Sequence, residues 1–351
     1  KSEIMDFDNA LSCVKRALIR AEEHAQVEIG SVLLALSGGH LQSLVNQGAQ
    51  QVTGRNHEIT EEDATAVITL AGTINLPPDR EVVHAIGQHF IIDDERVVRR
   101  AVGLEGARLA LDMLIMHGSR NRLHTPARLI RTIPMELEDV VFGGLCSAQA
   151  VLSPEQKEDG VLVIDLGGGT TDYALYADRK IAAVGSLAIG GDHVTNDIAA
   201  AFSIQTRQAE RIKQESGSAV VDVANRMRQI QVPPEVGFEA RSFTQGSLHT
   251  VIHARLDELF QLILRRVGGE HLRQLKAGVI VTGGGAKLKG VRELAERVFR
   301  LPCAMGRIQG VSGAVSQVAD PEYATAVGLL MIGHRMARQA APGWWARWRD
   351  R

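Results

Sequence analysis

Two spacings of apolar residues alternate along the chain, one typical of helices and the other of strands. From Asn9 to about Glu28, apolar residues recur every three or four positions, and the apolar run from Ser31 to Gly38 follows closely. The first spacing is that of a helix with one buried face, and a short apolar run that ends at a glycine is typical of a buried strand. This segment is therefore predicted to form a helix that leads into a sheet.

A small α/β unit is predicted between about Leu41 and Asn121. Thr60 is followed three residues later by Asp63, just before a helical stripe of apolar residues, and this spacing is typical of a capping box at the start of a helix. Two later apolar runs, VVHAIGQHFII and ARLALDMLIMHG, predict strands. The charged, glycine-containing stretch between those runs predicts loops.

From Thr125 onward, helices and strands are expected to alternate around a core sheet, the pattern of an α/β fold. The expected strands are 140–142, 160–166, 173–178, 180–187, 278–282 and 303–308. The expected helices are one from Thr125, then 147–152, 195–202, 206–215, 248–267, 291–299 and 325–336, with a loop rich in proline and glycine at 232–237.

Composition narrows the class of protein. Hydrophobic residues make up 45% and charged residues 23% of the 351 residues, as in a globular protein with a sizeable core. The formal net charge is -2, so the protein has no overall positive potential that would attract the phosphate backbone of a nucleic acid. Nucleic acid is therefore not an expected partner. Cys13, Cys146 and Cys303 lack the paired spacing of a metal site, and their odd number favours a reducing compartment.

The two ends of the sequence carry separate signals. No apolar run approaches the roughly 20 residues of a spanning helix, and the first residues lack the apolar core of a signal peptide, so we expect no unaided membrane crossing. The sequence starts with Lys1 and enters a helical pattern by Asp8, which leads us to expect a further N-terminal segment before it.

All three tryptophans, Trp344, Trp345 and Trp348, fall in the last eight residues. In a helix they would share one face, with Arg347 beside them. Indole rings favour the membrane interface and arginine favours anionic lipid, so this tail is interpreted as a membrane-binding segment. Two alternatives stay open: packing of the tryptophans onto the body, and capture by a partner protein.

The sharpest motif is DLGGGTTD, which follows the apolar run VLVI. Successive glycines expose backbone N–H groups that can cradle phosphate oxygens, and the threonine hydroxyls add donors. The aspartate at the strand end can hold Mg²⁺ through water. The alternative is a glycine-rich hairpin corner with no ligand. The candidate residues are Asp165 for the metal and Gly167, Gly168, Gly169, Thr170 and Thr171 for phosphate.

A second glycine corner, Gly283 to Gly285, follows the run GVIV and would let a flat adenosine lie against the backbone. Its alternative is a tight turn between a strand and a helix. Glu210 and Lys213 are three residues apart on one predicted helical face, so the carboxylate could bind ribose hydroxyls while the lysine stem covers the base. For that pair, the alternative is ordinary solvated surface charge.

These motifs resemble the nucleotide site of the superfamily that contains actin, MreB and the heat-shock chaperone ATPases. DLGGGTTD resembles its second phosphate loop, TGGGA its adenosine loop, and EYATAVGLL its second connecting helix. Within the superfamily the chain resembles the FtsA family over nearly its whole length, at LALSGGHL, ITEEDA, VVHAIGQHFIID, VVFGGLCSAQAVLS, GGDHVTNDIA, AERIK and ARLDEL.

The resemblance implies an α/β, actin-like (ribonuclease H-like) two-lobed fold with an FtsA-type 1C subdomain. It divides the chain into lobe 1 (1A, 1–41 and 122–158, lacking its N-terminal phosphate loop), subdomain 1C (42–121), lobe 2 (2A, 159–204 and 277–340), subdomain 2B (205–276) and a membrane-targeting tail (341–351). The unit at about 41–121 is the feature that favours FtsA over MreB and actin.

The resemblance also implies a function. ATP and Mg²⁺ would bind between the lobes, and the protein would polymerise on the cytoplasmic face of the inner membrane at the division site, as a peripheral protein. There it would anchor FtsZ filaments and recruit later division proteins through 1C. Arg241 and Arg255 match the family's basic surface for the FtsZ C-terminal peptide, although ordinary surface arginines are the alternative.

At most weak ATPase activity is expected. The family's first phosphate loop would precede Lys1, and the place of the residue that orients water in actin and MreB falls on Gly144; a slipped register would make Gln149 the candidate. Two other functions are alternatives. A phosphotransferase of the same superfamily would need a dedicated catalytic aspartate, which we do not find, and a pilus-assembly actin-like scaffold would differ in its partners.

Overall fold

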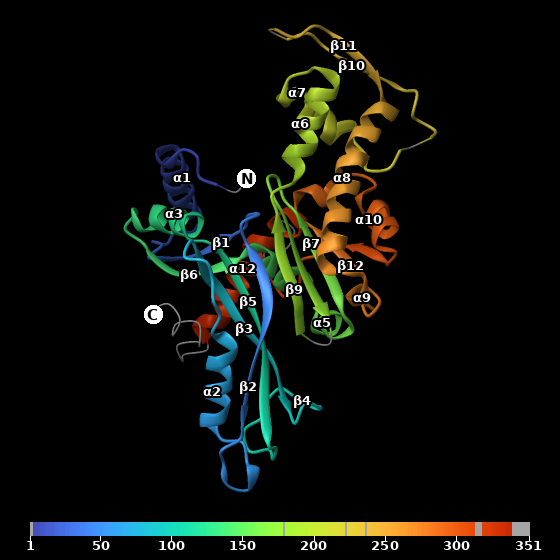
Figure 1. Ribbon diagram of the computed structural model, residues 1–351. Coiled ribbons are helices and arrows are strands. Elements are labelled where there is room, and N and C mark those ends of the chain that lie inside the picture. The colour runs from blue at the N-terminus through green and yellow to red at the C-terminus, as the bar shows by residue number, and fades with distance from the viewer. Residues whose placement is uncertain (1–2, 178–179, 222, 236, 313–317, 339–351) are drawn as a thin grey trace.

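The computed structural model describes residues 3–177, 180–221, 223–235, 237–312 and 318–338. A five-stranded sheet and a two-stranded sheet lie side by side, and a four-stranded sheet extends away from both (Figure 1). The strands are β1 (Ser31–Leu36), β2 (Gln42–Gln51), β3 (Arg80–Ile92), β4 (Arg96–Val98), β5 (Arg108–Ser119), β6 (Glu136–Phe142), β7 (Val161–Leu166), β8 (Thr171–Ala177), β9 (Lys180–Leu187), β10 (Gln229–Val232), β11 (Arg241–Thr244), β12 (Val279–Thr282) and β13 (Cys303–Met305).

Helices cover the sheets and connect the two lobes. The described α-helices are α1 (Phe7–Ala25), α2 (Glu61–Gly72), α3 (Arg120–Arg131), α4 (Gly143–Val151), α5 (Pro154–Asp159), α6 (Gly191–Phe202), α7 (Thr206–Ser216), α8 (Gln245–Val267), α9 (Gly269–Leu272), α10 (Val291–Phe299) and α12 (Ala324–Arg338). Short 3₁₀ turns are η1 (Arg55–His57), η2 (Gly284–Lys287) and η3 (Pro321–Tyr323).

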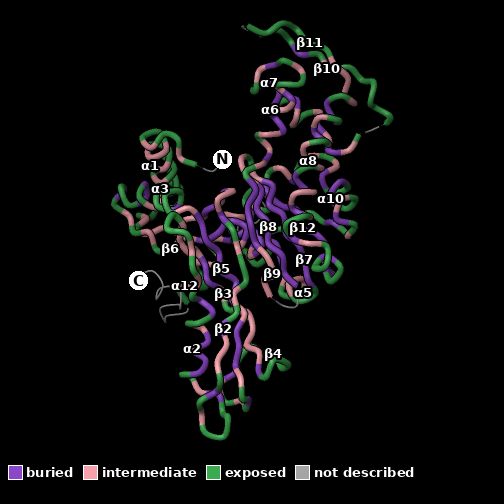
Figure 2. The backbone as a smooth tube through the Cα atoms, viewed as in Figure 1, coloured by how far each residue is buried: buried purple, intermediate pink, exposed green. Residues whose placement is uncertain are grey.

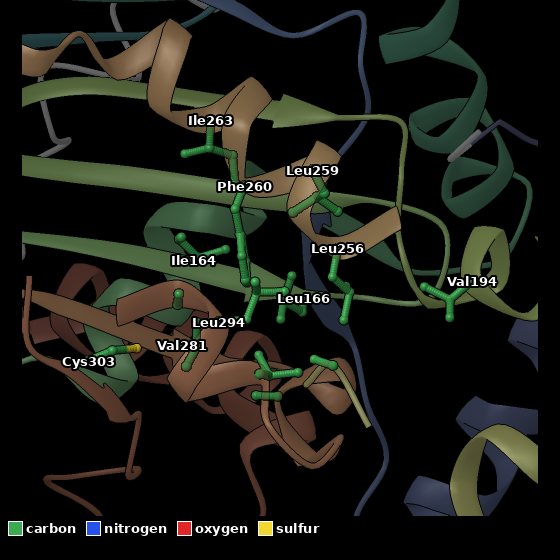
Figure 3. Packing of buried hydrophobic residues seen from close by; sticks show 14 of the residues in the cluster. Ile164, Leu166, Val194, Leu256, Leu259, Phe260, Ile263, Val281, Leu294 and Cys303 are labelled. Atoms are coloured by element: carbon green, nitrogen blue, oxygen red, sulfur yellow. The ribbon is translucent and has the colours of Figure 1, made fainter. Parts of the chain in front are cut away.

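The five-stranded sheet, in the order β13-β12-β7-β8-β9, contains the main core. Every residue of β7 is buried, which explains why its sequence is a continuous apolar run rather than an alternating one. Phe260 and Ile263 of α8 belong to the same buried cluster as Ile164 and Leu166 of β7 (Figure 3). The end of β7 is thereby fixed by packing from one side of the sheet.

The parallel pair β1 and β6 forms a separate small sheet, with α4 and α12 between this pair and the five-stranded sheet. The two helices touch closely where Gly328 of α12 meets Cys146 of α4. A Cβ on Gly328 would lie 1.7 Å from the backbone oxygen of Cys146. Only a residue without a side chain fits at this crossing.

The four-stranded sheet, in the order β2-β5-β3-β4, is covered by α2 and has its own core, which includes Val67, Met113 and Ile115. Strand β2 was missing from the predicted elements. Its sequence, QSLVNQGAQQ, is mostly polar, and nine of its ten positions are exposed or only partly buried, with Gly48 as the exception. Figure 2 shows this strand mostly in the colours of exposed and intermediate residues. Pairing with β5 along its whole length makes it a strand.

The predicted capping box at the start of α2 is confirmed. Asp63 accepts hydrogen bonds from the backbone N–H of Thr60 at 3.0 Å and from that of Thr53 at 3.1 Å, and from both threonine hydroxyls at 2.7 and 2.9 Å. Burial alone would raise the pKa of Asp63, but these four bonds outweigh it and lower the pKa to about 2.

We expect Asp63→Ala to destabilise the protein by about 2–3 kcal/mol at neutral pH, because four donors lose a charged acceptor. Since the folded pKa lies below the ordinary value of 3.8, this contribution is present above about pH 4 and is lost as the pH falls towards about 2. Urea unfolding at pH 7 and at acidic pH measures both effects. Glu62→Ala, at the exposed neighbour, is the control, and equal losses for the two variants would contradict the prediction.

The remaining differences from the predicted elements are local. Strands β10 and β11 form a hairpin in the region where only the loop at 232–237 was predicted, and in Figure 1 this hairpin projects from the top of the molecule. Helix α5 was not predicted, and α6 begins four residues earlier than expected, at Gly191. Among the described residues, no helix is both long enough and apolar enough to span a membrane.

Candidate functional site

A cavity of about 640 Å³ opens where β7 and β12 end side by side. Four groups of residues line it: the corner after β7, the start of α6, one face of α7, and the turn after β12. The lining residues are Leu166, Gly167, Gly168, Gly190, Gly191, Asp192, Val194, Glu210, Lys213, Gln214, Gly217, Leu256, Leu259, Gly284, Gly285, Lys287, Leu288, Lys289 and Glu322. Both glycine corners singled out from the sequence therefore reach one cavity.

The corner after β7 is held by backbone bonds. Gly167 N–H donates to the Thr170 carbonyl at 2.9 Å, and the N–H groups of Gly191 and Asp192 donate to the carbonyls of Gly167 and Gly168. A Cβ on Gly190 would lie 2.4 Å from the Gly168 oxygen, so α6 can approach the corner only with a glycine there. These backbone bonds and the close approach of α6 hold the loop in place.

The corner after β12 packs directly on the first one. Gly283 has a φ of 83°, in the left-handed region, and a Cβ there would lie 2.3 Å from Oδ1 of Asp165. A Cβ on Gly285 would lie 2.8 Å from Cβ of Leu166. A Cβ on Gly284 would meet only the Cβ of Glu322, at 3.9 Å, so there is open space around this position.

Helix α7 supplies the charged wall of the cavity. Lys213 Nζ lies 2.7 Å from Glu210 Oε2, and it donates to the Gly191 carbonyl at 3.1 Å and to Thr195 Oγ1 at 2.8 Å. Burial would raise the pKa of Glu210, but hydrogen bonds from Lys213, Thr195 and Gln214 lower it overall. Glu210 and Lys213 therefore form an ion pair at the cavity wall and are not two separate surface charges.

Asp165 lies beneath the two corners. Its Oδ2 accepts a hydrogen bond from Thr325 of α12 at 2.7 Å, and Ser147 of α4 also donates to this carboxylate. Burial raises the pKa of Asp165 above its ordinary value. Asp165 does not line the cavity, so its carboxylate would contact a cation there through a water molecule. Mg²⁺ bound at phosphates commonly keeps several such waters.

Asp172, the last residue of DLGGGTTD, is paired with Asp165 across β7 and β8. It accepts hydrogen bonds from Ser37 and Ser186, while its Oδ1 has no hydrogen-bond partner. Burial raises its pKa to about 7. Asp165 and Asp172 thus offer carboxylate oxygens, one of them without a hydrogen-bond partner, and carboxylate oxygens are the ligands that Mg²⁺ prefers. The described residues contain no cluster of three or more metal-ligating side chains.

Several candidates from the sequence lie elsewhere. Gly169, Thr170, Thr171 and Gly283 do not line the cavity, and Thr171 is fully buried with its hydroxyl donating to the Ile189 carbonyl at 2.8 Å. This hydroxyl is used inside the protein because β8 has already begun at Thr171.

Neither candidate for orienting water faces the cavity. Gln149 does not line it and accepts a hydrogen bond from Lys157 at 3.2 Å, and Gly144 is closed in by the Phe142 ring and Asp172. A Cβ on Gly144 would lie 2.6 Å from that ring, so the position leaves no room for a polar side chain.

The two arginines proposed for a partner differ in environment. Arg255 binds Asp197 of α6 through two bonds, at 2.6 and 3.0 Å, and Glu258 at 2.6 Å, so its charge is already paired within the protein. Arg241 is on the projecting β11 and lies 3.7 Å from the exposed Glu239. Trp344, Trp345, Arg347 and Trp348 lie outside the described residues.

The sequence interpretation missed Asp192, Lys287, Lys289 and Glu322 as cavity residues. Lys287 Nζ binds Asp320 at 2.7 Å and Glu322 at 3.4 Å, which ties η2 to η3 beside the second glycine corner. Two lysines directly after the TGGGA turn were the signal that could have identified this wall.

Two glycine corners at the ends of adjacent strands, with a cavity between them and two helices crossing between the lobes, define the actin-like class of α/β proteins. Solved structures agree: a chain of the PilM-PilN type IV pilus biogenesis complex superposes with a TM-score of 0.58 at 18% identity, covering 92% of this chain and 84% of that one. MreB5 of Spiroplasma citri bound to ADP gives 0.51 at 19% identity, covering 64% and 68%. The predicted fold class is confirmed.

Sequence relatives then define the family. A family model described as "Cell division protein FtsA" matches residues 162–328, and one described as "SHS2 domain inserted in FTSA" matches residues 38–117. The chain is 34% identical to the cell division protein FtsA of Pseudomonas aeruginosa over 95% of this chain and 80% of the relative, and 31% identical to that of Escherichia coli K12 over 95% and 81%. The chain belongs to the FtsA family of cell division proteins, as its motifs predicted.

Proposed function

We propose that this protein is an ATP-binding scaffold of the division machinery, which polymerises at the inner membrane and joins FtsZ filaments to it. The observation that supports nucleotide binding is the shared cavity: both glycine corners and the Glu210–Lys213 pair reach one space of about 640 Å³. That volume lies within the range of small-molecule sites. MreB5 of Spiroplasma citri, with the same fold, has been solved with ADP and with AMPPNP.

Within this proposal the corners have separate roles. Gly167 and Gly168 would present backbone to the phosphates, Gly284 and Gly285 would lie against the adenosine, and Glu210 would accept from the ribose hydroxyls while Lys213 holds it in place. Mg²⁺, when bound, would neutralise phosphate charge, with Asp165 as its carboxylate through water. At most weak hydrolysis is proposed, because neither Gln149 nor Gly144 lines the cavity.

The remaining assignments follow the family resemblance. We propose lobe 1 at 1–41 and 122–158, 1C at 42–121, lobe 2 at 159–204 and 277–340, and 2B at 205–276. The β10–β11 hairpin belongs to 2B in this division, and Arg241 is exposed there to an acidic peptide such as the FtsZ tail, whereas Arg255 would first have to leave Asp197. Later division proteins would be recruited through 1C.

The test of membrane scaffolding is co-sedimentation with phosphatidylglycerol vesicles. The intact chain is expected to pellet, more completely with ATP and Mg²⁺ because a polymer presents many tails together, and a chain that ends before Pro342 is expected to stay in solution. Neutral phosphatidylcholine vesicles are the control for charge. An intact chain that remains in the supernatant with anionic lipid and nucleotide would overturn the membrane part of the proposal.

A further inference from the structure

A second cavity, of about 470 Å³, lies at the joint between the four-stranded sheet and the five-stranded sheet. Gln88 and Arg99 line it from the β3–β4 side, Lys157 and Glu158 from α5, and Tyr176 and Lys180 from β8 and β9. It shares no lining residue with the cavity at the glycine corners. This is therefore a separate site, and its role does not depend on nucleotide binding at the first one.

Positive charge gathers in this second cavity from both sides of the joint. Arg99 Nη2 lies 3.7 Å from Glu158 Oε1, and Lys180 Nζ lies 3.6 Å from Asp112 Oδ2. Each of these ion pairs joins the four-stranded sheet to the rest of the protein. Arg99 and Lys180 are thus each paired with one carboxylate within the protein.

Lys157 has no such partner among the residues that the structure describes. Its ammonium group donates to the Gln149 amide oxygen at 3.2 Å and lies 5.6 Å from the centre of the Tyr176 ring, and both of these groups are neutral. Burial, with a contribution from the nearby Arg335, lowers the pKa of Lys157 to about 8. A partly desolvated ammonium with only neutral neighbours and a like charge nearby is costly, and an anion in the cavity would remove that cost.

The arrangement favours a multivalent anion over a single carboxylate. Three cations line the cavity: Arg99 just after β4, Lys157 on α5 and Lys180 on β9. A phosphoryl group has enough charge and enough acceptor oxygens to bind more than one of them. Guanidinium suits the phosphoryl oxygens through paired N–H groups, and lysine acts as a point charge. The volume is sufficient for a small phosphorylated molecule.

We propose that this cavity is a binding site for a phosphoryl group, held by Lys157 and Lys180 on one side of the joint and by Arg99 on the other. At this joint Gln88 Oε1 of β3 already accepts a hydrogen bond from the Ile181 N–H of β9, at 2.9 Å. A bound phosphoryl group would add contacts to both sheets and so fix the four-stranded sheet relative to lobe 2.

The site is tested by nuclear magnetic resonance of the intact chain with ¹³C-dimethylated lysines, titrated with inorganic pyrophosphate at constant ionic strength. The Lys157 signal, assigned by its loss in Lys157→Gln, is expected to shift saturably, and its pKa is expected to rise by about one unit, a tenfold change in proton affinity. Gly168→Asp, which alters the other cavity, is expected to keep the response. Signals of the exposed Lys276 should stay unmoved.

Further arms identify the source and the chemistry of the ligand. Phosphatidylglycerol vesicles in place of pyrophosphate separate a lipid headgroup from a soluble molecule, and a response to either one supports a phosphoryl site. Succinate at the same ionic strength is expected to shift Lys157 less than pyrophosphate does. A Lys157 signal that responds to neither phosphoryl source, that moves only as much as Lys276, or that shifts equally with succinate overturns the proposal.

Discussion

Gly328→Ala is expected to destabilise the protein by about 3 kcal/mol, even though alanine favours a helix interior by about 1 kcal/mol over glycine. The added Cβ would lie 1.7 Å from the backbone oxygen of Cys146 and 2.4 Å from its carbonyl carbon. Both atoms belong to the backbone of α4, so the clash is relieved only if one helix moves away from the other. Because α4 and α12 also hold Asp165 through Ser147 and Thr325, separating the helices loosens the floor beneath the first cavity.

Gly333→Ala is the matched control for this prediction, on the same helix. A Cβ there would lie 2.4 Å from Cδ1 of Leu33, the far end of a flexible side chain, which can change rotamer. We therefore expect Gly333→Ala to change the free energy of unfolding by less than about 1 kcal/mol. Chemical denaturation followed by circular dichroism measures both variants, and equal stability of the two would show that the helix crossing is not tightly packed.

Gly168→Asp is expected to weaken ATP binding by about 100-fold, because a carboxylate would replace open backbone where we place the phosphates, and like charges in contact cost several kcal/mol. The fold can accept the new side chain, since a Cβ on Gly168 meets Asp192 Oδ1 at an ordinary 3.4 Å. The second carboxylate would then lie beside Asp192, which raises the negative charge of this wall further.

Titration with a fluorescent ATP analogue in the presence of Mg²⁺ measures the affinity. Gly30→Asp makes the same substitution at an exposed position where a Cβ meets nothing within 4 Å, and it is expected to bind as the unaltered chain does. Circular dichroism of both variants checks folding. Unchanged affinity in Gly168→Asp would argue that nucleotide does not bind between the glycine corners.

The parts of the fold that were predictable from sequence are those dictated by local chemistry. Thr60 and Asp63 form the predicted capping box because both partners lie within one helical turn. The run before Asp165 is apolar throughout because β7 is buried on both faces, and the glycine corners follow since backbone elements approach each other closely there.

The parts that could not be predicted depend on partners far away in the sequence. Residues 42–51 form strand β2 because their backbone pairs with β5, which ends at Ser119. The mostly polar sequence of β2 contains no local pattern that predicts this pairing. Arg255 could be read as a free surface charge only because Asp197, 58 residues earlier, was not known to face it. The Thr171 hydroxyl was assigned to phosphate for the same reason, since Ile189 accepts it from another segment.

The four-stranded sheet leaves the body and returns to it at a single place. Gln42, where β2 begins, pairs with His117 near the end of β5, and the Ser119 N–H donates to Nδ1 of His40 at 3.3 Å. The two attachment points of the unit are therefore neighbours, so removing or exchanging everything between them would require only a short connector and would leave the order of the other sheets unchanged. An actin-like body built in this way can gain or lose such an appendage in one genetic step.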